Sequence, residues 1–590
     1  MKDNDYLIKK SFQGYLVPSI LAILGGNISF MADHIIAGKV LGGDALAAMS
    51  MTGPLFFLFT AIGTLICVGS STMASVYLGK EDRCGANKLF TLAGLLILLC
   101  GGLFTVAGFA FLEPIVNFLS GGSELHLLVR DYCRGFIPGA VCIMAVYLPL
   151  NFFRIEGRGY LGMIMFLILS VLDIVLDLYF TIALGLGMYG LSVATVISSL
   201  IATCAVTPFL FFKGGGYRLV SVKKTLRLIN SIFIVGSPPA LNNFYSVVRS
   251  LVLNIIIFSA GGPAAVAGFA FTNSVNTLAQ AIISGMAQTV SPLVGVLFGE
   301  HDVMSIKKVC KLAVRLGIAS MLVFGILLSV FSRQLCILFG LTSAVEQAIA
   351  VPALILSAVS LSGVMINQIL CYYYMTIGRT RIANLITLCR GLLFILSAAF
   401  ILSRIFGIVG IWISFSVSEA LTLIITALVV KRMLLKETKL RGMLLLDHRD
   451  VDEGRYISFT VDTNQEAVVE SSSKISSFCD KCELSPKQSM IIGLAIEEIL
   501  LLMIQHVFAD KENEAIDVKI FVRDESTIMR FRCGGRKFNP LAYYQAEMKQ
   551  DGEARDMKAD ESMGLQLISK MAKQVDYSTN LGLNNIVVRI

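Results

Sequence analysis

Three aspartates lie inside long apolar segments of the sequence, where a carboxylate is costly and needs a partner or a use. Asp33 lies late in the first segment, and Asp173 and Asp177 lie in the fifth, four residues apart and therefore on one helix face. Thr195, in the sixth segment, adds a hydroxyl. The set predicts a cation site, because such oxygens suit Na⁺ and desolvated, mutually repelling carboxylates can exchange protons near neutral pH. The alternative is that Asp33 ends a helix and faces water.

The second half of the chain carries other polar groups within apolar segments. Arg390 and Glu419 are predicted to form a structural ion pair. Arg249 is a further charged residue in these segments, and no partner is assigned to it. Four amides could line a substrate cavity or could serve as hydrogen-bonding contacts between helices, and both readings stay open for Asn254, Gln280, Gln288 and Asn367.

The elements that must position these groups are membrane-spanning helices. Only 15% of the 590 residues are charged and the mean hydropathy is +0.75, whereas a soluble chain carries about 25% charged residues. Apolar runs of about 20 residues, the length that crosses a bilayer, recur from 14–36 to 408–430. We therefore expect an all-α membrane protein with twelve transmembrane helices, embedded in the lipid bilayer.

Basic residues gather in alternate short loops rather than in a patch for nucleic acid, and no nucleic-acid partner is expected. Because the cytoplasmic loops of membrane proteins are the basic ones, this distribution predicts that both termini are cytoplasmic. The first apolar run lacks a signal-peptide cleavage pattern. The basic loops include Lys9, Lys10, Lys80, Arg83, Lys88, Lys307, Lys308, Lys431 and Arg432.

The membrane part is an internal repeat. Pro18 and Pro238 lie 220 residues apart, and the same spacing joins Gly42 with Gly262. It also joins Asp82 with Asp302 and Gly187 with Gly407. This predicts two six-helix lobes, residues 1–220 and 221–435, with a transport path between them and alternating access by rocking.

The composition changes after the last apolar run. Residues 436–455 are predicted to be a linker, and 456–590 a cytoplasmic α/β sandwich domain. Strands are expected at 457–461, 518–522, 527–532 and 586–590, with helices from Ser485, an N-cap before Pro486, to about 508, and over 563–575. The 13 cysteines show no metal-type spacing, so no metal site is expected.

Residues 10–435 resemble the multidrug and toxic compound extrusion family. The likeness rests on MADHIIAG at 31–38, LAA at 46–48 and QTVSPLVG at 288–295. It implies twelve helices in two lobes and export of drugs, other organic cations or metabolites, driven by inward H⁺ or Na⁺. It also implies an ion site in the first lobe, which Asp33, Asp177 and Thr195 match. Asp173 stands where the family has Asn, and we hypothesise that this extra carboxylate favours protons.

Residues 456–590 resemble the GHKL ATPase fold of anti-sigma-factor serine kinases, on LAIEE at 494–498, GG at 534–535 and MGLQLI at 563–568. Such a site needs an Asn for Mg²⁺ four residues after Glu498, where Leu502 stands, and an Asp for adenine, where Cys533 stands. The site also needs glycines that let the backbone approach phosphate; Gly535 and Gly564 belong to this candidate site, but Lys537 and Ser562 occupy two of the glycine places. The resemblance thus implies a degenerate site, with no catalysis and no ATP bound, and a regulatory module with a protein partner. The alternative keeps weak nucleotide binding.

The leading hypothesis is a secondary antiporter of the bacterial plasma membrane that moves small amphipathic or cationic compounds, uses no cofactor and is not an enzyme. Two alternatives stay open. A membrane-anchored signalling protein would need an active kinase domain. A lipid-precursor flippase of the same superfamily would need a cationic cavity for pyrophosphate.

Overall fold

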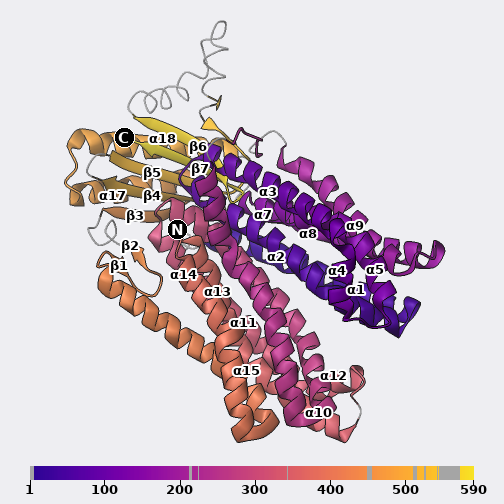
Figure 1. Ribbon diagram of the computed structural model, residues 1–590. Helices are drawn as coiled ribbons and strands as arrows, with labels where there is room; N and C mark the ends of the chain where they lie inside the picture. Colours follow the sequence, from indigo (N-terminus) through magenta and orange to yellow (C-terminus); the bar gives the residue numbers. More distant parts are fainter. Residues whose placement is uncertain are drawn as a thin grey trace. The chain divides into compact units, whose positions relative to one another are not determined.

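The computed structural model describes residues 6–211, 216–222, 225–341, 343–447, 455–508, 514–523, 526–540, 542–543 and 572–590. It divides into two compact units, Gly14–Met433 and a unit made of Met1–Gln13 with Leu434–Ile590. The first unit is helical and the second contains the strands (Figure 1).

The N-terminal half of the helical unit is built from long apolar helices joined by short turns. Its π-helical turns η1 and η3 directly follow α1 and α8. The elements are α1 (Tyr6–Ile36), η1 (Ala37–Leu41), α2 (Gly43–Gly79), α3 (Arg83–Ala110), α4 (Leu112–Ser120), α5 (His126–Phe136), η2 (Ile137–Gly139), α6 (Ala140–Ala145), α7 (Tyr147–Ile155), α8 (Gly159–Leu178), η3 (Tyr179–Ala183), α9 (Gly187–Val206) and η4 (Thr207–Leu210).

The C-terminal half contains two very long helices, α10 and α15, each broken at a glycine with positive φ. Gly262 (φ 65°) interrupts α10 and Gly407 (φ 60°) interrupts α15. The elements are α10 (Leu226–Gly299), α11 (Val303–Val330), α12 (Ser332–Leu338), α13 (Ala344–Thr376), α14 (Thr380–Leu388), η5 (Cys389–Leu393) and α15 (Phe394–Lys436).

By length and composition, eleven helices of the described chain could cross a membrane, one of which (Pro486–Val507) belongs to the C-terminal unit. The protein is thus mostly helical, with many apolar helices. The count of twelve spans stays a prediction, which treats α10 as two spans and the continuous run Thr380–Lys436, made of α14, η5 and α15, as another two.

The sequence repeat recurs in the backbone. Gly42 (φ 98°) and Gly262 (φ 65°) lie with positive φ at breaks between helical segments, as do Gly187 (φ 56°) and Gly407 (φ 60°). Glycine has no Cβ and takes this conformation without strain. Both pairs lie 220 residues apart, so the two halves break their helices at equivalent places.

The turns after α2 and α10 are also equivalent. Glu81 (φ 65°) and His301 (φ 59°) both adopt the left-handed conformation. Each precedes an aspartate that caps the next helix: Asp82 accepts from Gly85 N (2.7 Å) and Asp302 accepts from Ser305 N (3.1 Å). A side-chain oxygen at this position satisfies a free N–H of the first helical turn.

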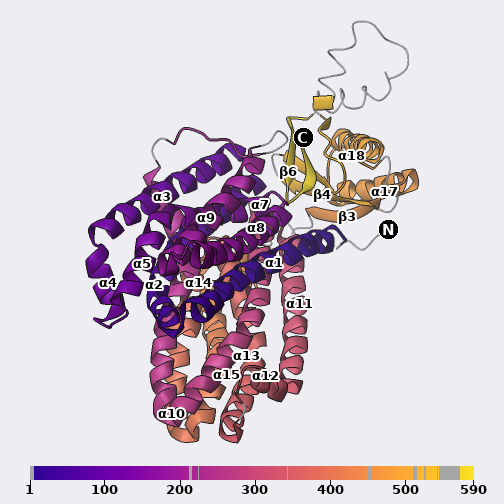
Figure 2. The ribbon, with the colours of Figure 1, turned by 90° about the vertical axis from the view of Figure 1, so that its right-hand side faces the viewer.

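Each half has its own apolar core. In the N-terminal half Phe59 stacks on Phe136, with ring centroids 5.6 Å apart, inside a cluster that begins at Ala22 and also takes in Ile232 from the start of α10. In the C-terminal half Trp412 stacks on Phe269 at 6.3 Å. Figures 1 and 2 show the helices of the two halves as separate groups that diverge from a common end.

The halves meet where α2 packs against α10. A Cβ on Gly79 would lie 2.1 Å from the carbonyl oxygen of Val296, and a Cβ on Gly236 would lie 1.9 Å from that of Leu65. Only glycine permits backbones to approach this closely. The contact between the halves is therefore set by backbone shape.

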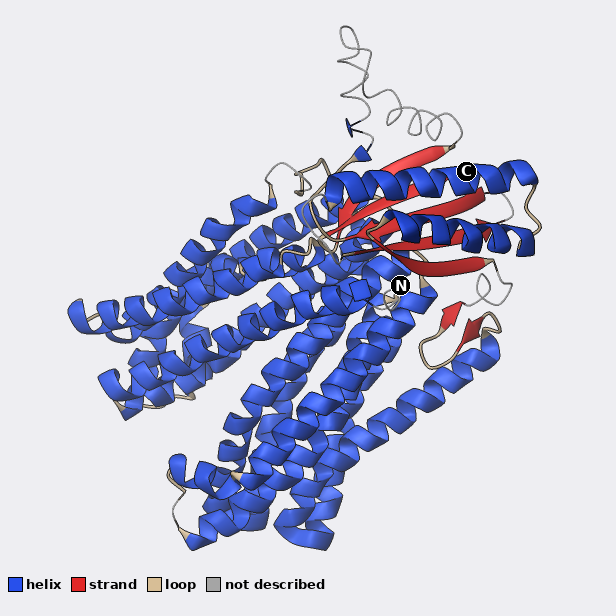
Figure 3. Cartoon of the chain, turned by 180° about the vertical axis from the view of Figure 1, so that it is seen from behind, coloured by secondary structure: helices blue, strands red, loops and turns tan. Residues whose placement is uncertain are grey.

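The C-terminal unit is a two-layer α/β structure. Its sheet has the order β3-β4-β5-β7-β6 with antiparallel neighbours, and α17 and α18 run alongside one another across it (Figure 3). A short hairpin, β1 and β2, precedes it. The elements are β1 (Leu440–Arg441), β2 (Leu446–Asp447), β3 (Tyr456–Asp462), α17 (Gln465–Lys481), α18 (Pro486–Val507), β4 (Ala515–Arg523), β5 (Ser526–Cys533), β6 (Gln574–Asn580) and β7 (Leu583–Arg589).

The start of α18 is as predicted: Ser485 is the N-cap, Pro486 the first helical residue, and Gln488 completes a capping box. The predicted helix at 563–575 is wrong at its end, because Val575 pairs with Val588 in the sheet. Residues 563–571, including Gly564, lie outside the described residues. Helix α17 was not expected, since its run of serines has low helix propensity. It is held by burying Val468, Ile475, Phe478 and Cys479.

Candidate functional site

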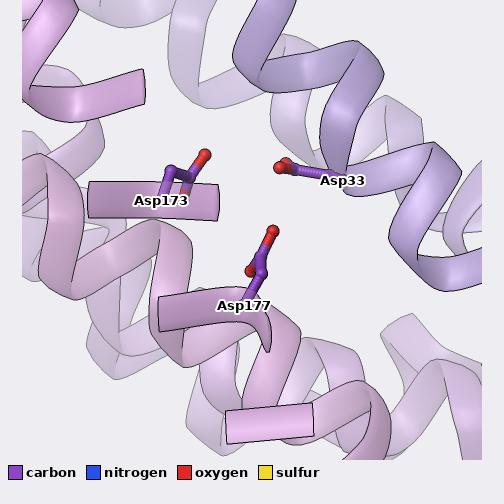
Figure 4. Close-up of side chains that lie close together, drawn as sticks. All are labelled: Asp33, Asp173 and Asp177. Atoms are coloured by element: carbon purple, nitrogen blue, oxygen red, sulfur yellow. The ribbon is translucent and has the colours of Figure 1, made fainter. Parts of the chain in front are cut away.

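The three aspartates come together. One carboxylate oxygen from each of Asp33, Asp173 and Asp177 lies within 4.8 Å of the others. All three side chains are buried, with 5%, 1% and 0% exposure. Figure 4 shows Asp33 on one helix facing Asp173 and Asp177 on another. The sequence placed the latter two on one helix face, and the structure brings Asp33 to that face.

Local backbone geometry positions the two helices. α1 turns into π-helix η1 shortly after Asp33, and α8 turns into η3 shortly after Asp177. Such π-helical turns are rare and occur often at functional sites. The hydroxyl of Ser170 donates to the carbonyl oxygen of Gly25 (2.8 Å), so α8 is bonded to α1 one turn away from the acids.

The three carboxylates differ in their hydrogen bonds. Asp173 accepts from Ser29 on α1 and from Ser198 on α9, the latter at 2.9 Å. In the described part of the chain, Asp33 Oδ1 and both oxygens of Asp177 are buried without a hydrogen-bond partner. Asp173 is thus held in place, while Asp33 and Asp177 keep acceptor oxygens available.

Three carboxylates this close repel one another strongly in a poorly hydrated environment. Positive charge must offset that repulsion, either as protons on the carboxylates or as a bound cation. Carboxylate oxygens are ligands for hard cations. The arrangement can therefore take up and release H⁺ or a hard cation such as Na⁺.

Thr195 lies on α9, one turn before Ser198, and its hydroxyl donates to the carbonyl oxygen of Leu191 (3.3 Å). Ser29 and Ser198, which bond Asp173, were missed in the sequence. The sequence carried a partial signal for both: Ser29 lies four residues before Asp33, and Ser198 three residues after Thr195, so each shares a helix face with a predicted residue. Their contact with Asp173 depends on how the helices pack.

A second polar site lies where the two halves meet. Arg154 at the end of α7 donates to the side-chain oxygen of Gln288 on α10. Both line a cavity of about 20 Å³, whose further polar residues are Ser71, Thr72, Asn151, Ser291 and Tyr372. Thr72 and Ser291 bond across the halves at 3.3 Å, and Ser291 bonds Thr376 at 2.9 Å.

The other predicted cavity amides are placed elsewhere. Asn367 is fully buried, and its amide donates to the backbone oxygen (3.1 Å) and carboxylate (2.7 Å) of Glu419. Asn254 is half-buried and Gln280 is exposed. Of the four, Gln288 is the one that lines the cavity at Arg154.

The predicted ion pair of the C-terminal half is present. Arg390 Nε lies 3.3 Å from Glu419 Oε1, and both side chains are 9% exposed. Arg390 also donates to Gln368. With Asn367 on the other carboxylate oxygen, this buried pair joins α13, η5 and α15.

The residues that the GHKL resemblance would place at a nucleotide site are mostly core residues. Leu502 and Cys533 are buried, and Glu498 is half-buried on α18. Burial raises the pKa of the Cys533 thiol to about 12. Gly535 keeps a positive φ of 91°. An apolar side chain at Leu502 cannot ligate Mg²⁺, and a protonated thiol does not replace the carboxylate that would read adenine.

The family model described as MatE matches the chain twice, over residues 18–179 and 238–400. Among relatives, the multidrug export protein MepA of Staphylococcus saprophyticus is 25% identical over 468 residues, covering 77% of this chain and 100% of its own. A MepA protein of Staphylococcus haemolyticus is 23% identical, covering 72% of this chain and 93% of its own.

Solved structures show the same fold. An outward-facing multidrug resistance MATE family transporter of the MOP superfamily has a TM-score of 0.67 at 24% identity, covering 71% of this chain and 94% of that one. A MATE structure in the bent conformation also scores 0.67, at 23% identity, covering 73% and 96%. Because the family model covers more than half of the sequence, the chain belongs to the MatE family and is a multi-pass membrane transporter, not an enzyme.

Proposed function

We propose that this transporter is a secondary antiporter that exports amphipathic or cationic compounds across the bacterial plasma membrane, driven by inward H⁺ or Na⁺. The observation that carries the proposal is the buried cluster of Asp33, Asp173 and Asp177, with oxygens within 4.8 Å of one another. Two relatives that bear the name multidrug export protein support the export of drugs.

The cluster offers a physical route to coupling. When it holds a proton or cation, repulsion between α1 and α8 falls and the two helices can stay packed. When the ion leaves, three like charges remain at short range and favour a different helix arrangement. An ion that binds one arrangement better than the other shifts their populations by its differential affinity.

The extra carboxylate at Asp173 bears on the choice of ion. A single Na⁺ would leave three carboxylates with an uncompensated negative charge in a buried site, whereas protons can neutralise them one at a time. Ser29 and Ser198 already satisfy Asp173. We therefore favour protons as the driving ion, with Na⁺ as the alternative.

The helix arrangement supports alternating access between two six-helix lobes, residues 1–220 and 221–435, with twelve spans. Gly79 of α2 and Val296 of α10 touch beside the turns that carry Lys80 and Arg83, which the distribution of basic residues assigns to the cytoplasm. The helices diverge toward the opposite end (Figure 2). Contact at a cytoplasmic end corresponds to a state closed to the cytoplasm, with both termini on that side.

We assign the C-terminal unit a regulatory role, as a kinase-like domain that binds a protein partner rather than ATP. Its support is the burial of Leu502 and Cys533 at positions where a nucleotide site needs a metal ligand and a carboxylate. Calorimetry with ATP and Mg²⁺ on the full-length protein tests this. Saturable heat at millimolar nucleotide would overturn it.

The lipid-precursor flippase alternative requires a cationic cavity. The cavity at Arg154 offers one guanidinium and about 20 Å³, too little room for a lipid-linked diphosphate. This cavity therefore gives the flippase no support, whereas the buried acidic cluster supports antiport.

The test is efflux of a cationic dye from proteoliposomes under separately imposed pH and Na⁺ gradients. We expect Asp33→Asn and Asp177→Asn to lower gradient-driven efflux by roughly tenfold or more, since each removes a charge from the ion site at a cost above about 1.4 kcal/mol. Asp131→Asn, which changes an exposed acid on α5, is the matched control. Normal coupled transport by both Asp33→Asn and Asp177→Asn would show that the cluster is not the coupling site.

A further inference from the structure

In the part of the chain that the structure describes, Arg154 is a buried cation without an ion-pair partner. Its side chain is 4% exposed, and its described hydrogen bond goes to the neutral amide of Gln288. The second terminal nitrogen, Nη2, is buried without a partner among the described residues. A guanidinium cannot lose its charge at neutral pH, so the protein cannot avoid the cost by deprotonating it.

The surroundings of this guanidinium are polar but not acidic. The residues that line its cavity include three hydroxyl side chains, two amides and Tyr372, and no carboxylate. Hydroxyl and amide groups can donate to an anion but supply no negative charge. A buried charge that lacks a partner costs several kcal/mol. A small anion would supply the negative charge that the cavity lining lacks.

The size of the cavity limits the occupant. At about 20 Å³ it has room for one or two water-sized particles. A halide fits such a space, whereas a diphosphate or an aromatic carboxylate does not.

We propose that the cavity at Arg154 is a binding site for a small monovalent anion, with chloride as the physiological ligand. The Arg154 guanidinium holds the anion, and the surrounding hydroxyls and amides complete its shell. This site is separate from the acidic cluster and would stand even if the chain exported something other than drugs.

The position of the site gives anion binding a consequence. Arg154 and Asn151 come from α7 and Ser71 and Thr72 from α2, whereas Gln288 and Ser291 come from α10. The cavity therefore exists only while the two halves touch here. A ligand that binds one state alone stabilises it by mass action, so chloride favours the state in which this interface is closed.

The experiment measures the thermal unfolding of the purified full-length protein in detergent. Sodium chloride is compared with sodium gluconate at equal sodium concentration and ionic strength. We expect chloride to raise the Tm of the wild type by about 2 °C. Arg154→Gln should abolish the rise, and Arg154→Lys, which keeps the charge, should retain part of it. Arg158→Gln, which alters the arginine four residues later, should leave it unchanged.

A direct measurement keeps the proposal testable if Arg154→Gln does not fold. Line broadening of ³⁵Cl⁻ by the wild-type protein should be removed when bromide displaces the bound chloride. At low chloride the broadening should be weaker in Arg154→Lys, which holds the anion less tightly. The absence of both broadening and the Tm rise in the wild type would show that the cavity holds only water and overturn the proposal. Stabilisation by formate but not by chloride would overturn it in favour of a carboxylate site.

Discussion

Gly79 on α2 and Gly299 on α10 meet in a symmetric contact. A Cβ on Gly79 would lie 3.0 Å from Gly299 Cα and 2.1 Å from the Val296 carbonyl oxygen. A Cβ on Gly299 would lie 2.9 Å from Gly79 Cα and 2.3 Å from the Val76 carbonyl oxygen. Both Val76 with Val296 and Gly79 with Gly299 are 220 residues apart. The internal repeat is thus self-complementary at this point, as a two-fold interface between identical subunits would be.

A bulky residue at this contact should block closure of the interface. We expect Gly79→Leu to lower dye efflux from proteoliposomes by roughly tenfold or more, since every 1.4 kcal/mol against the closed state is a factor of about ten in its population. The neighbouring atoms are backbone and cannot rotate away.

Gly102→Leu is the control for this prediction, because a Cβ on Gly102 of α3 would meet no atom within 4 Å. Both variants replace a helical glycine by a better helix former, so helix propensity cannot account for a difference between them. Equal transport by the two variants would contradict the role given to the glycine contact.

Removing the Ser198 hydroxyl should change the ion dependence of transport. The hydroxyl bonds Asp173 Oδ1 at 2.9 Å and stabilises the carboxylate in its charged form. If protons drive transport, Ser198→Ala should reach half-maximal efflux at a proton concentration about tenfold lower. If Na⁺ does, loss of a nearby oxygen should instead raise the Na⁺ concentration required.

The control is Ser192→Ala on the same helix, whose hydroxyl donates to the backbone oxygen of Tyr189 (2.9 Å) and does not reach the acids. Efflux rates are measured against pH and against Na⁺ in separate series. If the proton and Na⁺ concentrations that give half-maximal efflux are the same in Ser198→Ala and the wild type, Ser198 does not act on the coupling site.

The buried pair of Arg390 and Glu419 should be far more sensitive than a surface pair. Glu419→Leu leaves a guanidinium buried and removes the carboxylate that accepts from Asn367, so we expect the free energy of unfolding to fall by about 3–5 kcal/mol. Replacing both partners, as Arg390→Met with Glu419→Leu, should cost less, since no unpaired charge remains. Thermal unfolding in detergent ranks the variants by their unfolding temperature.

The exposed pair of Glu113 and Arg130 (2.8 Å, both side chains 49% exposed) provides the comparison. Glu113→Gln should cost about 0–1 kcal/mol. A double replacement that unfolds at a lower temperature than Glu419→Leu would contradict the argument from unpaired charge.

Features with a local signal were predictable from the sequence. The four-residue spacing of Asp173 and Asp177 fixed their common face, and Ser485 with Pro486 fixed the start of α18. In each case the physical cause lies within one or two helical turns of the residues named.

Contacts between helices were not predictable in the same way. Leu92 and Leu99 lie on the same helix α3, yet one is 4% and the other 68% exposed. In a membrane both the packed interior and the surrounding lipid favour leucine, so hydrophobic periodicity does not show which face of a helix packs against its neighbours. For the same reason nothing in the sequence paired Arg154 with Gln288, and Ser29 was found beside Asp173 only through the packing of α1 on α8.

Cys533 should resist alkylation until the C-terminal unit unfolds. Burial raises the pKa of its thiol to about 12, so at pH 8 only about one thiol in ten thousand is the reactive thiolate. Its sulfur also accepts a weak hydrogen bond from Asn584 Nδ2 (3.9 Å). Treatment of the native protein with N-ethylmaleimide at pH 8 should modify the exposed Cys84 within minutes and leave Cys533 unmodified, as read by peptide mass spectrometry.

The raised pKa of the Cys533 thiol also determines whether stability rises or falls with pH. An unfolded thiol ionises from about pH 8.5, whereas folded Cys533 keeps its proton to higher pH. The unfolded state therefore loses protons first, and this thiol lowers the free energy of unfolding by about 1.4 kcal/mol per pH unit between about 8.5 and 12. Cys533→Ala should unfold with a weaker dependence on alkaline pH than the wild type. An equal slope for both proteins, or rapid modification of native Cys533, would mean that the thiol is not enclosed by the core formed by α18 and the sheet.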